Sequence, residues 1–279
     1  MRKLSSQAWL NYISRLNGID KQARKELKEW ILKWGVDENG NLLDNINHAV
    51  AGRNETFTDF CYQIVQKYSD ASGALSAAMY DAIAELEGAS VPAAEMAANA
   101  TKDDIFKTVD GVLKTSRNVD EMTGAISRYV KKASCDTMLQ NAYRDRAQYA
   151  WIPVGDTCAF CMALAAQGWV NVSVQKIRKG YPHAEHIHSN CDCNYAVRFN
   201  NDTEVAGYDP DYYTDKFYEA RDWSEEHDGE YPNFGWNGLN FMNSDSLNAM
   251  RRMTYAQNKD KINAQKREAY AKRTEEKKD

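Results

Sequence analysis

The sequence has no run of apolar residues long enough to cross a membrane. Residues 1–7 carry two positive charges with no apolar run behind them, so we expect neither a signal peptide nor a membrane anchor. The sequence also lacks an internal repeat, a phosphate-binding glycine loop, a metalloprotease helix with paired histidines and a Ser-His-Asp arrangement. These absences argue against a membrane partner and lower the expectation of an enzyme.

Net charge is also low. A formal charge of −5 over 279 residues gives no global attraction to nucleic acid. The charges are nevertheless segregated. Residues 202–230 hold eleven acidic side chains against Lys216 and Arg221, whereas residues 250–279 hold ten basic side chains against five acidic ones. We interpret the basic tail as a solvated helix, with a phosphate-binding tail as the alternative.

Cysteine is scarce and unevenly distributed. Four of the six cysteines and three of the five histidines lie within residues 158–193. Cys158-x-x-Cys161 is followed by His188-x-x-Cys191-x-Cys193, and thiolates and imidazole at this spacing are ligands for tetrahedral zinc. In a reducing compartment such spacing indicates a metal site more often than disulfides. The sequence therefore predicts a structural Zn²⁺ site, which supplies folding energy to a segment with little apolar core.

Five donors compete for the four places around that zinc ion. The favoured set is Cys158, Cys161, His188 and Cys191, while Cys193 either replaces Cys191 or faces the core. This supply of donors argues against a catalytic zinc, which would keep one place open for water. It also argues against a thiol redox site, because the later donors would then have no role.

Before residue 150 the apolar residues recur at helical spacing. One predicted helix is capped by Asp20 and ends at Gly35, and a second begins at about residue 55 and stops before Pro92. A third follows a capping box at Thr101, and a fourth begins at about residue 119 and continues to about residue 145. The breadth of the apolar stripes predicts that these helices pack against one another.

The helical spacing of apolar residues stops at Trp151, because the proline and glycine that follow are unfavourable in helices. Short strands are predicted at residues 169–174 and 195–199, with a short helix closed by glycine at residues 162–168. A last helix begins at about Ser244. The predicted fold class is α+β, divided into a helical domain, a small zinc-knuckle module with β structure, and an acidic linker region with a basic helical tail: residues 1–150, 151–200 and 201–279.

Two runs around the predicted zinc site resemble a known family. They are Val-Gly-Asp-Thr-Cys-Ala-Phe-Cys at residues 154–161 and His-Ile-His-Ser-Asn-Cys-Asp-Cys at residues 186–193. Residues 140–200 are similar to tailed-phage minor head proteins, the head morphogenesis group that includes the Mu F-like minor capsid proteins. Many members have a proline after the knuckle histidine and an arginine between the last two cysteines. Here Ser189 and Asp192 stand there, so the metal donors are kept but a positive contact is lost.

The resemblance implies a non-enzymatic virion component that acts in head morphogenesis. Such a protein would lie in the capsid interior or at the portal vertex after assembly in the host cytoplasm. Its implied partners are the portal and the major capsid protein. The basic C-terminal tail is the segment expected to contact packaged DNA, and Trp223, Trp236 and Phe241 are expected to offer further partner contacts.

Two alternatives follow from the same residues. The first is a zinc-containing ββα-metal (HNH-like) nuclease, with its histidines among His183, His186 and His188. Cys191 and Cys193 argue against it, because they occupy the place where its helix should begin. The second is a zinc nucleic-acid-binding module, for which the basic residues around the knuckles are too few without the tail: Lys176, Arg178, Lys179 and Arg198.

Overall fold

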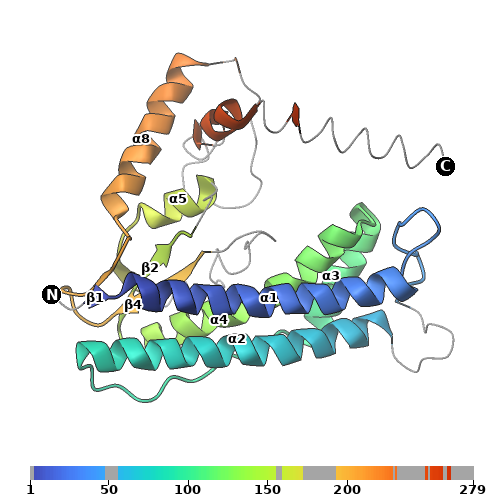
Figure 1. The fold of residues 1–279 in the computed structure, drawn as a ribbon, viewed down its shortest axis with the longest axis horizontal. Helices are drawn as coiled ribbons and strands as arrows, with labels where there is room; N and C mark the ends of the chain where they lie inside the picture. The colour runs from blue at the N-terminus through green and yellow to red at the C-terminus, as the bar shows by residue number, and fades with distance from the viewer. Residues whose placement is uncertain are drawn as a thin grey trace. The chain divides into compact units, whose positions relative to one another are not determined.

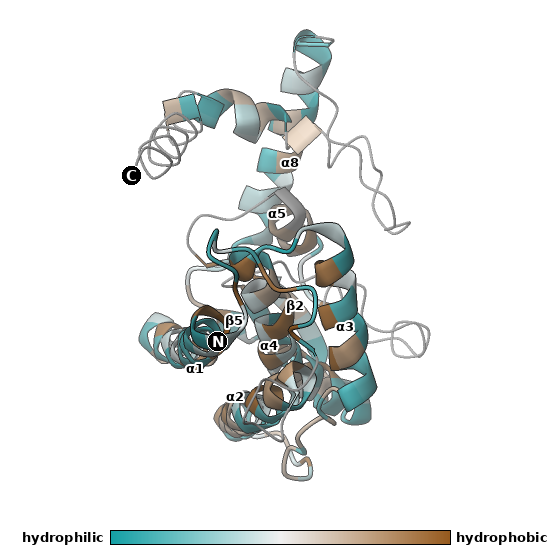
Figure 2. Ribbon diagram, turned by 90° about the vertical axis from the view of Figure 1, so that its right-hand side faces the viewer, coloured by the Kyte–Doolittle hydropathy of each residue, from teal (hydrophilic) through white to brown (hydrophobic). Residues whose placement is uncertain are grey.

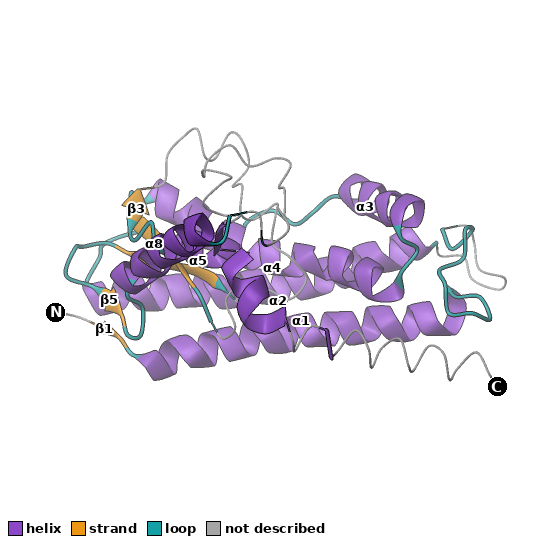
Figure 3. Ribbon diagram, turned by 90° about the horizontal axis from the view of Figure 1, so that it is seen from above, coloured by secondary structure: helices purple, strands orange, loops and turns teal. Residues whose placement is uncertain are grey.

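The structure is a computed structural model, and its contacts divide the chain into two compact units (Figure 1). The first unit comprises Met1–Gly155 and Trp169–Tyr208, and the second comprises Asp156–Gly168 and Asp209–Asp279. The described parts are mostly helical with a few strands (Figure 3), which confirms the predicted α+β class. The structure describes residues 3–47, 56–154, 159–171, 193–228, 230, 249–250, 252–259 and 263–264.

Four helices form the body of the first unit: α1 (Ser6–Trp34), α2 (Phe57–Glu87), α3 (Lys102–Thr115) and α4 (Val119–Arg144). Near one end of the bundle, the hydroxyls of Tyr12 and Ser76 are hydrogen-bonded at 2.8 Å. Further along, Lys67 Nζ donates to Glu26 at 2.9 Å. The residue numbers of these contacts rise along α1 while they fall along α2, so the two helices are antiparallel. Their apolar faces enclose a core that includes Leu27, Ile31, Phe57, Val65, Ile105, Met122 and Ile126.

Helices α2 and α4 run parallel. The Ser69 hydroxyl donates to the Tyr129 carbonyl at 3.4 Å, and the Tyr80 hydroxyl donates to Asp145 at 2.8 Å, so both sets of numbers rise together. The chain must therefore return along the bundle between the two helices. Residues 89–101, here called the crossing segment, make this return without regular secondary structure before α3 begins.

The start of α1 differs from the prediction. Ser5 caps this helix, its side chain accepting the Ala8 N–H at 3.1 Å, so α1 begins far upstream of Asp20. Asp20 lies inside α1 as a buried carboxylate, which accepts from Arg24 Nε at 2.8 Å and lies 3.8 Å from Lys131 Nζ on α4. The prediction was wrong because aspartate favours helix starts, whereas here it is held by two cations within the bundle.

The other helix ends agree with the sequence signals. Capping boxes at Thr56 with Asp59 and at Thr101 with Asp104 start α2 and α3, so their first amide groups are satisfied. Gly88 ends α2 at a φ of 69°, a left-handed conformation that glycine adopts without strain. Asn118 caps α4, which confirms the predicted start at about residue 119.

A small antiparallel sheet, ordered β3-β2-β4, packs beside α4 in the first unit. Its strands are β2 (Gln148–Ile152), β3 (Val170–Asn171) and β4 (Asn194–Arg198), with Trp151 paired to Tyr195. The described parts of β3 and β4 agree with the predicted strands, but β2 was not predicted. Asn194 fixes the sheet to α4, since its Nδ2 donates to Ser134 Oγ at 2.5 Å. A separate parallel pair joins β1 (Lys3–Leu4) to β5 (Glu204–Val205).

In the second unit, α5 (Ala159–Ala165) packs against α8 (Pro210–Glu226). Asp209 caps α8 and proline occupies its first turn, where a missing N–H costs nothing. The Thr214 hydroxyl on α8 donates to the Ala166 carbonyl after α5 at 3.3 Å. The described residues between 249 and 264 are helical, as predicted. Across the described ranges, no helix combines the length and apolar character that a membrane span requires.

Candidate functional site

Two of the five predicted zinc donors fall on described residues. Cys161 lies on α5 in the second unit and is buried, with 1% of its surface exposed. Cys193 directly precedes β4 in the first unit and is half-buried. Cys158, His188 and Cys191 lie outside the described residues, as do His183 and His186 of the nuclease alternative. In the part of the chain that is described, no three His, Cys, Asp or Glu side chains gather in a way that could hold a metal ion.

The surroundings of Cys193 bear on its predicted role. Cys193 lines a cavity of about 20 Å³ together with Cys135, Ser134 and Ile13. Cys135 Sγ donates to Asn194 Oδ1 at 3.5 Å, so the residue next to Cys193 is hydrogen-bonded into the same region. Of the two roles open for Cys193, this position favours facing the core of the first unit.

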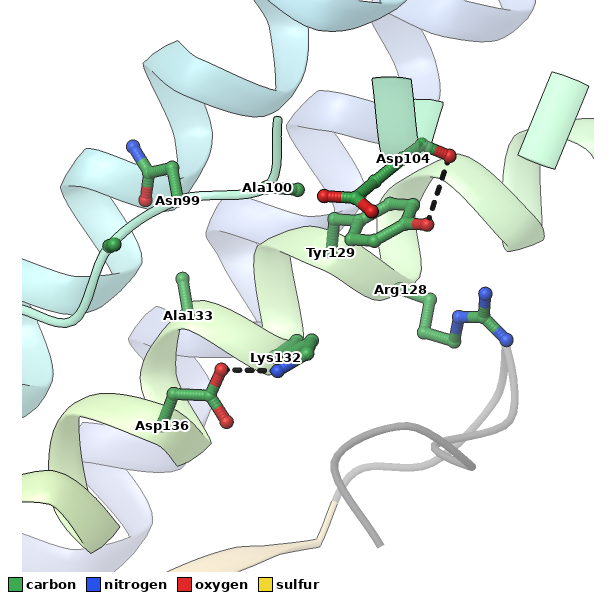
Figure 4. Close-up of a pocket in the computed structure, with 9 residues that line it drawn as sticks. Asn99, Ala100, Asp104, Arg128, Tyr129, Lys132, Ala133 and Asp136 are labelled. Carbon is green, nitrogen blue, oxygen red and sulfur yellow. Dashed lines mark hydrogen bonds and ion pairs between the residues drawn. The ribbon is translucent and has the colours of Figure 1, made fainter. Parts of the chain in front are cut away.

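A second candidate site is a polar pocket of about 380 Å³ (Figure 4). The crossing segment forms one wall, the first turn of α3 supplies Asp104, and α4 supplies the remaining side chains. Figure 4 shows Tyr129 near the centre, with Asp104 on one side and Lys132 and Asp136 on the other. The described lining residues are Ala98, Asn99, Ala100, Asp104, Arg128, Tyr129, Lys132, Ala133 and Asp136.

The charged groups of the polar pocket are engaged with neighbouring side chains. Lys132 Nζ donates to Asp136, and the Tyr129 hydroxyl donates to the Asp104 carbonyl at 3.2 Å. The Asp104 carboxylate accepts from the Thr101 hydroxyl at 2.7 Å and from its N–H at 3.0 Å. These two hydrogen bonds from Thr101 lower the pKa of Asp104 and keep it ionised.

The polar pocket suits binding better than bond-making chemistry. Its described lining holds no serine, cysteine or histidine, and its lysine is paired with a carboxylate. From the sequence, only the capping box at Thr101 is predicted, and Asp104 belongs to it. The pocket was missed because its wall is the crossing segment, whose path has no periodic signal in the sequence.

The aromatic residues predicted to contact a partner are only partly described. Trp223 on α8 is half-buried and stacks on His227, with ring centroids 4.3 Å apart. Tyr212 and Tyr218 on the same helix are more exposed, at 54% and 49%. Trp236 and Phe241 lie outside the described residues, as does most of the basic tail. In its described part, Arg252 Nη1 donates to Ser224 at 3.3 Å and lies 3.9 Å from Asp228.

Comparison with known proteins places the chain in one family. The family model described as VG15 protein matches residues 3–220, which include the helical body, the predicted zinc motifs and most of α8. No curated protein and no solved structure matches the chain. Because the matched part is well over half of the sequence, the chain belongs to the VG15 protein family, a family of phage proteins.

Proposed function

We propose that the chain is a structural minor capsid protein of a tailed phage, which docks near the portal and the inner capsid face during head morphogenesis. One observation carries the proposal: a single phage family spans both the helical body and the cysteine-histidine motifs. The helices and the motifs therefore lie within one matched region, and the motifs are those that resemble the minor head proteins.

The helical body suits a structural role. Its polar groups are used for holding elements together, as Asn194 and Ser134 do between the sheet and α4. Its ionised residues form surface pairs such as Lys28 with Asp120 at 2.8 Å. This pattern supports a rigid scaffold whose outer faces contact other head proteins.

The proposal includes a structural zinc ion held by Cys158, Cys161, His188 and Cys191. Three thiolates and one imidazole fit tetrahedral zinc, and the cavity that Cys193 lines together with Cys135 supports a ligand set without Cys193. When bound, the ion would fix the geometry of the loops that carry its ligands. Asp156 and Asp192 flank the ligands and are suited to accept hydrogen bonds from an imidazole or from loop amides.

Elemental analysis of the purified chain tests the zinc assignment. We expect one equivalent of zinc in the natural sequence, little in Cys158→Ser, and an unchanged equivalent in Cys193→Ser, because the proposed ligand set omits Cys193. The matched pair of cysteine substitutions controls for the general loss of a thiol. Loss of zinc in Cys193→Ser with retention in Cys191→Ser would reverse the assignment of the fourth ligand.

Fractionation of intact phage particles tests the docking proposal. We expect the chain to co-purify with the portal or the capsid shell and to stay with one of them after the DNA is removed. Recovery of the chain free of both in intact particles would remove the structural role.

The basic tail is the segment proposed to contact packaged DNA. Phosphate contacts by lysine and arginine weaken as salt rises, so retention on DNA should fall steeply with ionic strength. Deleting residues 259–279 should abolish this retention. Retention that persists after the deletion would place any DNA contact elsewhere.

No DNA cleavage is expected with Mg²⁺ or Mn²⁺, and cleavage that a His183→Ala, His186→Ala variant abolishes would favour the nuclease instead.

A further inference from the structure

The crossing segment is held to α4 by side chains that lie one helical turn apart. The Asn141 carboxamide bonds both main-chain groups of Glu95, since it accepts the N–H at 3.0 Å and donates to the carbonyl at 2.8 Å. One turn earlier on α4, the Thr137 hydroxyl accepts the Ala97 N–H at 3.1 Å. Four residues of helix advance by about 6 Å and two residues of extended chain by about 6.6 Å, so the two series stay in step.

The other side of the crossing segment faces α2. Figure 2 colours much of α2 brown or pale, and among the described residues two of its side chains bond the main chain of the segment. Asp81 accepts the Ala94 N–H at 2.8 Å. Gln66 Nε2 donates to the Ala100 carbonyl at 2.9 Å. Between residues 94 and 100, even-numbered residues therefore turn their main-chain groups toward α2 and odd-numbered residues turn theirs toward α4, which is the two-residue period of an extended chain.

The next step along both series leads to Asn99 on the segment and Ala133 on α4, and both line the polar pocket. In Figure 4, Ala133 lies between Asn99 and the pair formed by Lys132 and Asp136. Ala133 ends in a methyl group, so it offers neither a donor nor an acceptor. Within the described ranges, no group bonds the main-chain N–H or carbonyl of Asn99, whose side chain donates to Asp70 on α2 at 2.6 Å. The α4 side therefore lacks one bonding group at the polar pocket.

The unbonded main-chain groups of Asn99 restrict the chemistry of a ligand. A carboxylate has no donor for the carbonyl, and an ammonium group has no acceptor for the N–H. A primary carboxamide has a donor and an acceptor on the same edge. Asn141 uses that edge to bond Glu95 in the same segment, so the protein itself shows which group fits an extended residue beside α4.

The charges of the polar pocket also favour a neutral group. Two carboxylates and two cations line it, so its formal charge is zero: Asp104, Asp136, Arg128 and Lys132. Lys132 donates to Asp136, and the Asp104 carboxylate accepts from the Thr101 hydroxyl at 2.7 Å. A charged ligand would lose hydration without gaining a net opposite charge. The volume of about 380 Å³ lies within the usual range of small-molecule sites, about 300–1,000 Å³.

We propose that the polar pocket binds a primary carboxamide, the group carried by glutamine and asparagine, through the main-chain N–H and carbonyl of Asn99. The ligand takes the place beside Asn99 that Asn141 takes beside Glu95. Its carboxamide comes from a free amino acid or from a side chain of a peptide, and both sources present the same group to the pocket. This site does not depend on the proposed capsid role.

NMR titration of the isotope-labelled full-length chain with L-glutamine and L-asparagine tests the proposal. At least one of them should shift the Asn99 amide signal in a saturable way. L-glutamate and L-aspartate have the same length but no amide donor, and they should leave that signal in place. Absence of a shift with both amides, or an equal shift with the acids, would overturn the proposal.

Matched variants test whether Asn99 makes the bond, with binding followed at the Ala100 amide, which also lines the pocket. Asn99→Pro removes the N–H and should weaken binding by at least about tenfold. Asn99→Ala loses the same side chain but keeps the N–H, and Ala98→Pro removes a neighbouring N–H that faces α2. Both should bind within about twofold of the natural sequence. Circular dichroism verifies the fold of each variant, and equal weakening in all three would overturn the assignment to Asn99.

A substitution on α4 tests the same position without altering the crossing segment. Ala133→Asn supplies an internal carboxamide, which should exclude the ligand and slow hydrogen exchange at the Asn99 amide. Ala133→Leu has no donor or acceptor, so it should exclude the ligand without slowing that exchange. Unchanged exchange at Asn99 in a folded Ala133→Asn variant would show that the two series do not meet there and would overturn the proposal.

A blocked tripeptide distinguishes the two sources of the carboxamide. The probe is Gly-Gln-Gly with an acetyl group at its N-terminus and an N-methylamide at its C-terminus. Tighter binding than that of L-glutamine assigns the site to a side chain of a peptide, and weaker binding assigns it to the free amino acid. Equal binding by the same peptide with glutamate in place of glutamine would mean that the peptide main chain bonds Asn99, which would overturn the carboxamide.

Discussion

Single buried polar residues hold the crossing segment to the bundle. Asn141 on α4 is fully buried and accepts the Glu95 N–H at 3.0 Å, while its Nδ2 donates to the Glu95 carbonyl at 2.8 Å. Thr137, one turn earlier, accepts the Ala97 N–H at 3.1 Å. These side chains replace the partner strand that an extended backbone would otherwise need. The sequence gives no sign of these contacts, because the two residues of each pair are at least 40 residues apart.

Replacing Asn141 should therefore destabilise the first unit strongly. Asn141→Ala leaves the N–H and the carbonyl of Glu95 without partners, and we expect the free energy of unfolding to fall by about 3 kcal/mol. Urea unfolding followed by circular dichroism measures the change. The exposed Asn11→Ala provides the control. A loss below about 1 kcal/mol would mean that water replaces the side chain at Glu95.

One carboxylate should make stability depend on acid pH. The hydrogen bond from Lys102, followed by that from Thr56, lowers the pKa of Asp59 from its ordinary value of 3.8 to about 2. The folded state binds a proton at the Asp59 carboxylate less tightly than the unfolded state does. The stabilisation from this carboxylate is therefore complete above the ordinary pKa of 3.8 and is lost as the pH falls toward 2. Asp59→Asn should flatten the pH dependence of urea unfolding in that window. Asp120→Asn, at an exposed ion pair, is the control, and an equal flattening there would contradict the assignment.

At the scale of elements, the helices could be predicted from signals close together in the sequence. The apolar period, the capping threonines and Gly88 are signals that lie within a few residues of one another. Helices α2 and α4 begin and end close to the predicted positions, and α3 begins at its predicted capping box. The strands depended on distant partners. Strand β2 was missed because its pairing with β4 joins Ala150 to Ala196, and no local pattern reports such a pair.

The capping box of α3 offers a test at this scale. Thr101→Ala removes the hydroxyl that accepts the Asp104 N–H at 3.2 Å and donates to its carboxylate at 2.7 Å. We expect a loss of about 1 kcal/mol in the free energy of unfolding, the usual value for a helix cap. Thr115→Ala near the other end of α3 removes only hydroxyl bonds to the Gly111 and Val112 carbonyls and should change stability by less than about 0.5 kcal/mol. Equal losses would show that the cap has no special role.

At the scale of the whole molecule, the chain forms two units, and each combines segments distant in sequence. The candidate zinc site could be predicted from spacing alone, because ligand chemistry restricts residue types. The assignment of its ligands stays a prediction, since three of the five donors lie outside the described residues. The three-part division of the chain also stays a prediction, as it depends on that zinc module.

A substitution that destabilises one unit should leave the stability of the other unit unchanged. Ala220 on α8 is fully buried, so Ala220→Glu places a charge without a partner in the second unit. Hydrogen exchange should then accelerate in α5 and α8, while α2 and α4 keep their protection. Glu219→Ala, at the exposed neighbouring position, should leave both patterns unchanged. Faster exchange in α2 and α4 as well would show that the chain unfolds as one cooperative body.

The crossing segment has a consequence for enzymatic digestion. An alanine-rich stretch between two helices, with no secondary structure of its own, has the composition of a linker that proteases cut first. Cleavage requires the main chain to leave its surroundings and enter the protease cleft. Here it is tied to α2 and α4 at Pro92, Ala93, Ala94, Glu95, Ala97 and Ala100. Limited digestion should therefore spare this stretch for as long as the helices themselves stay intact.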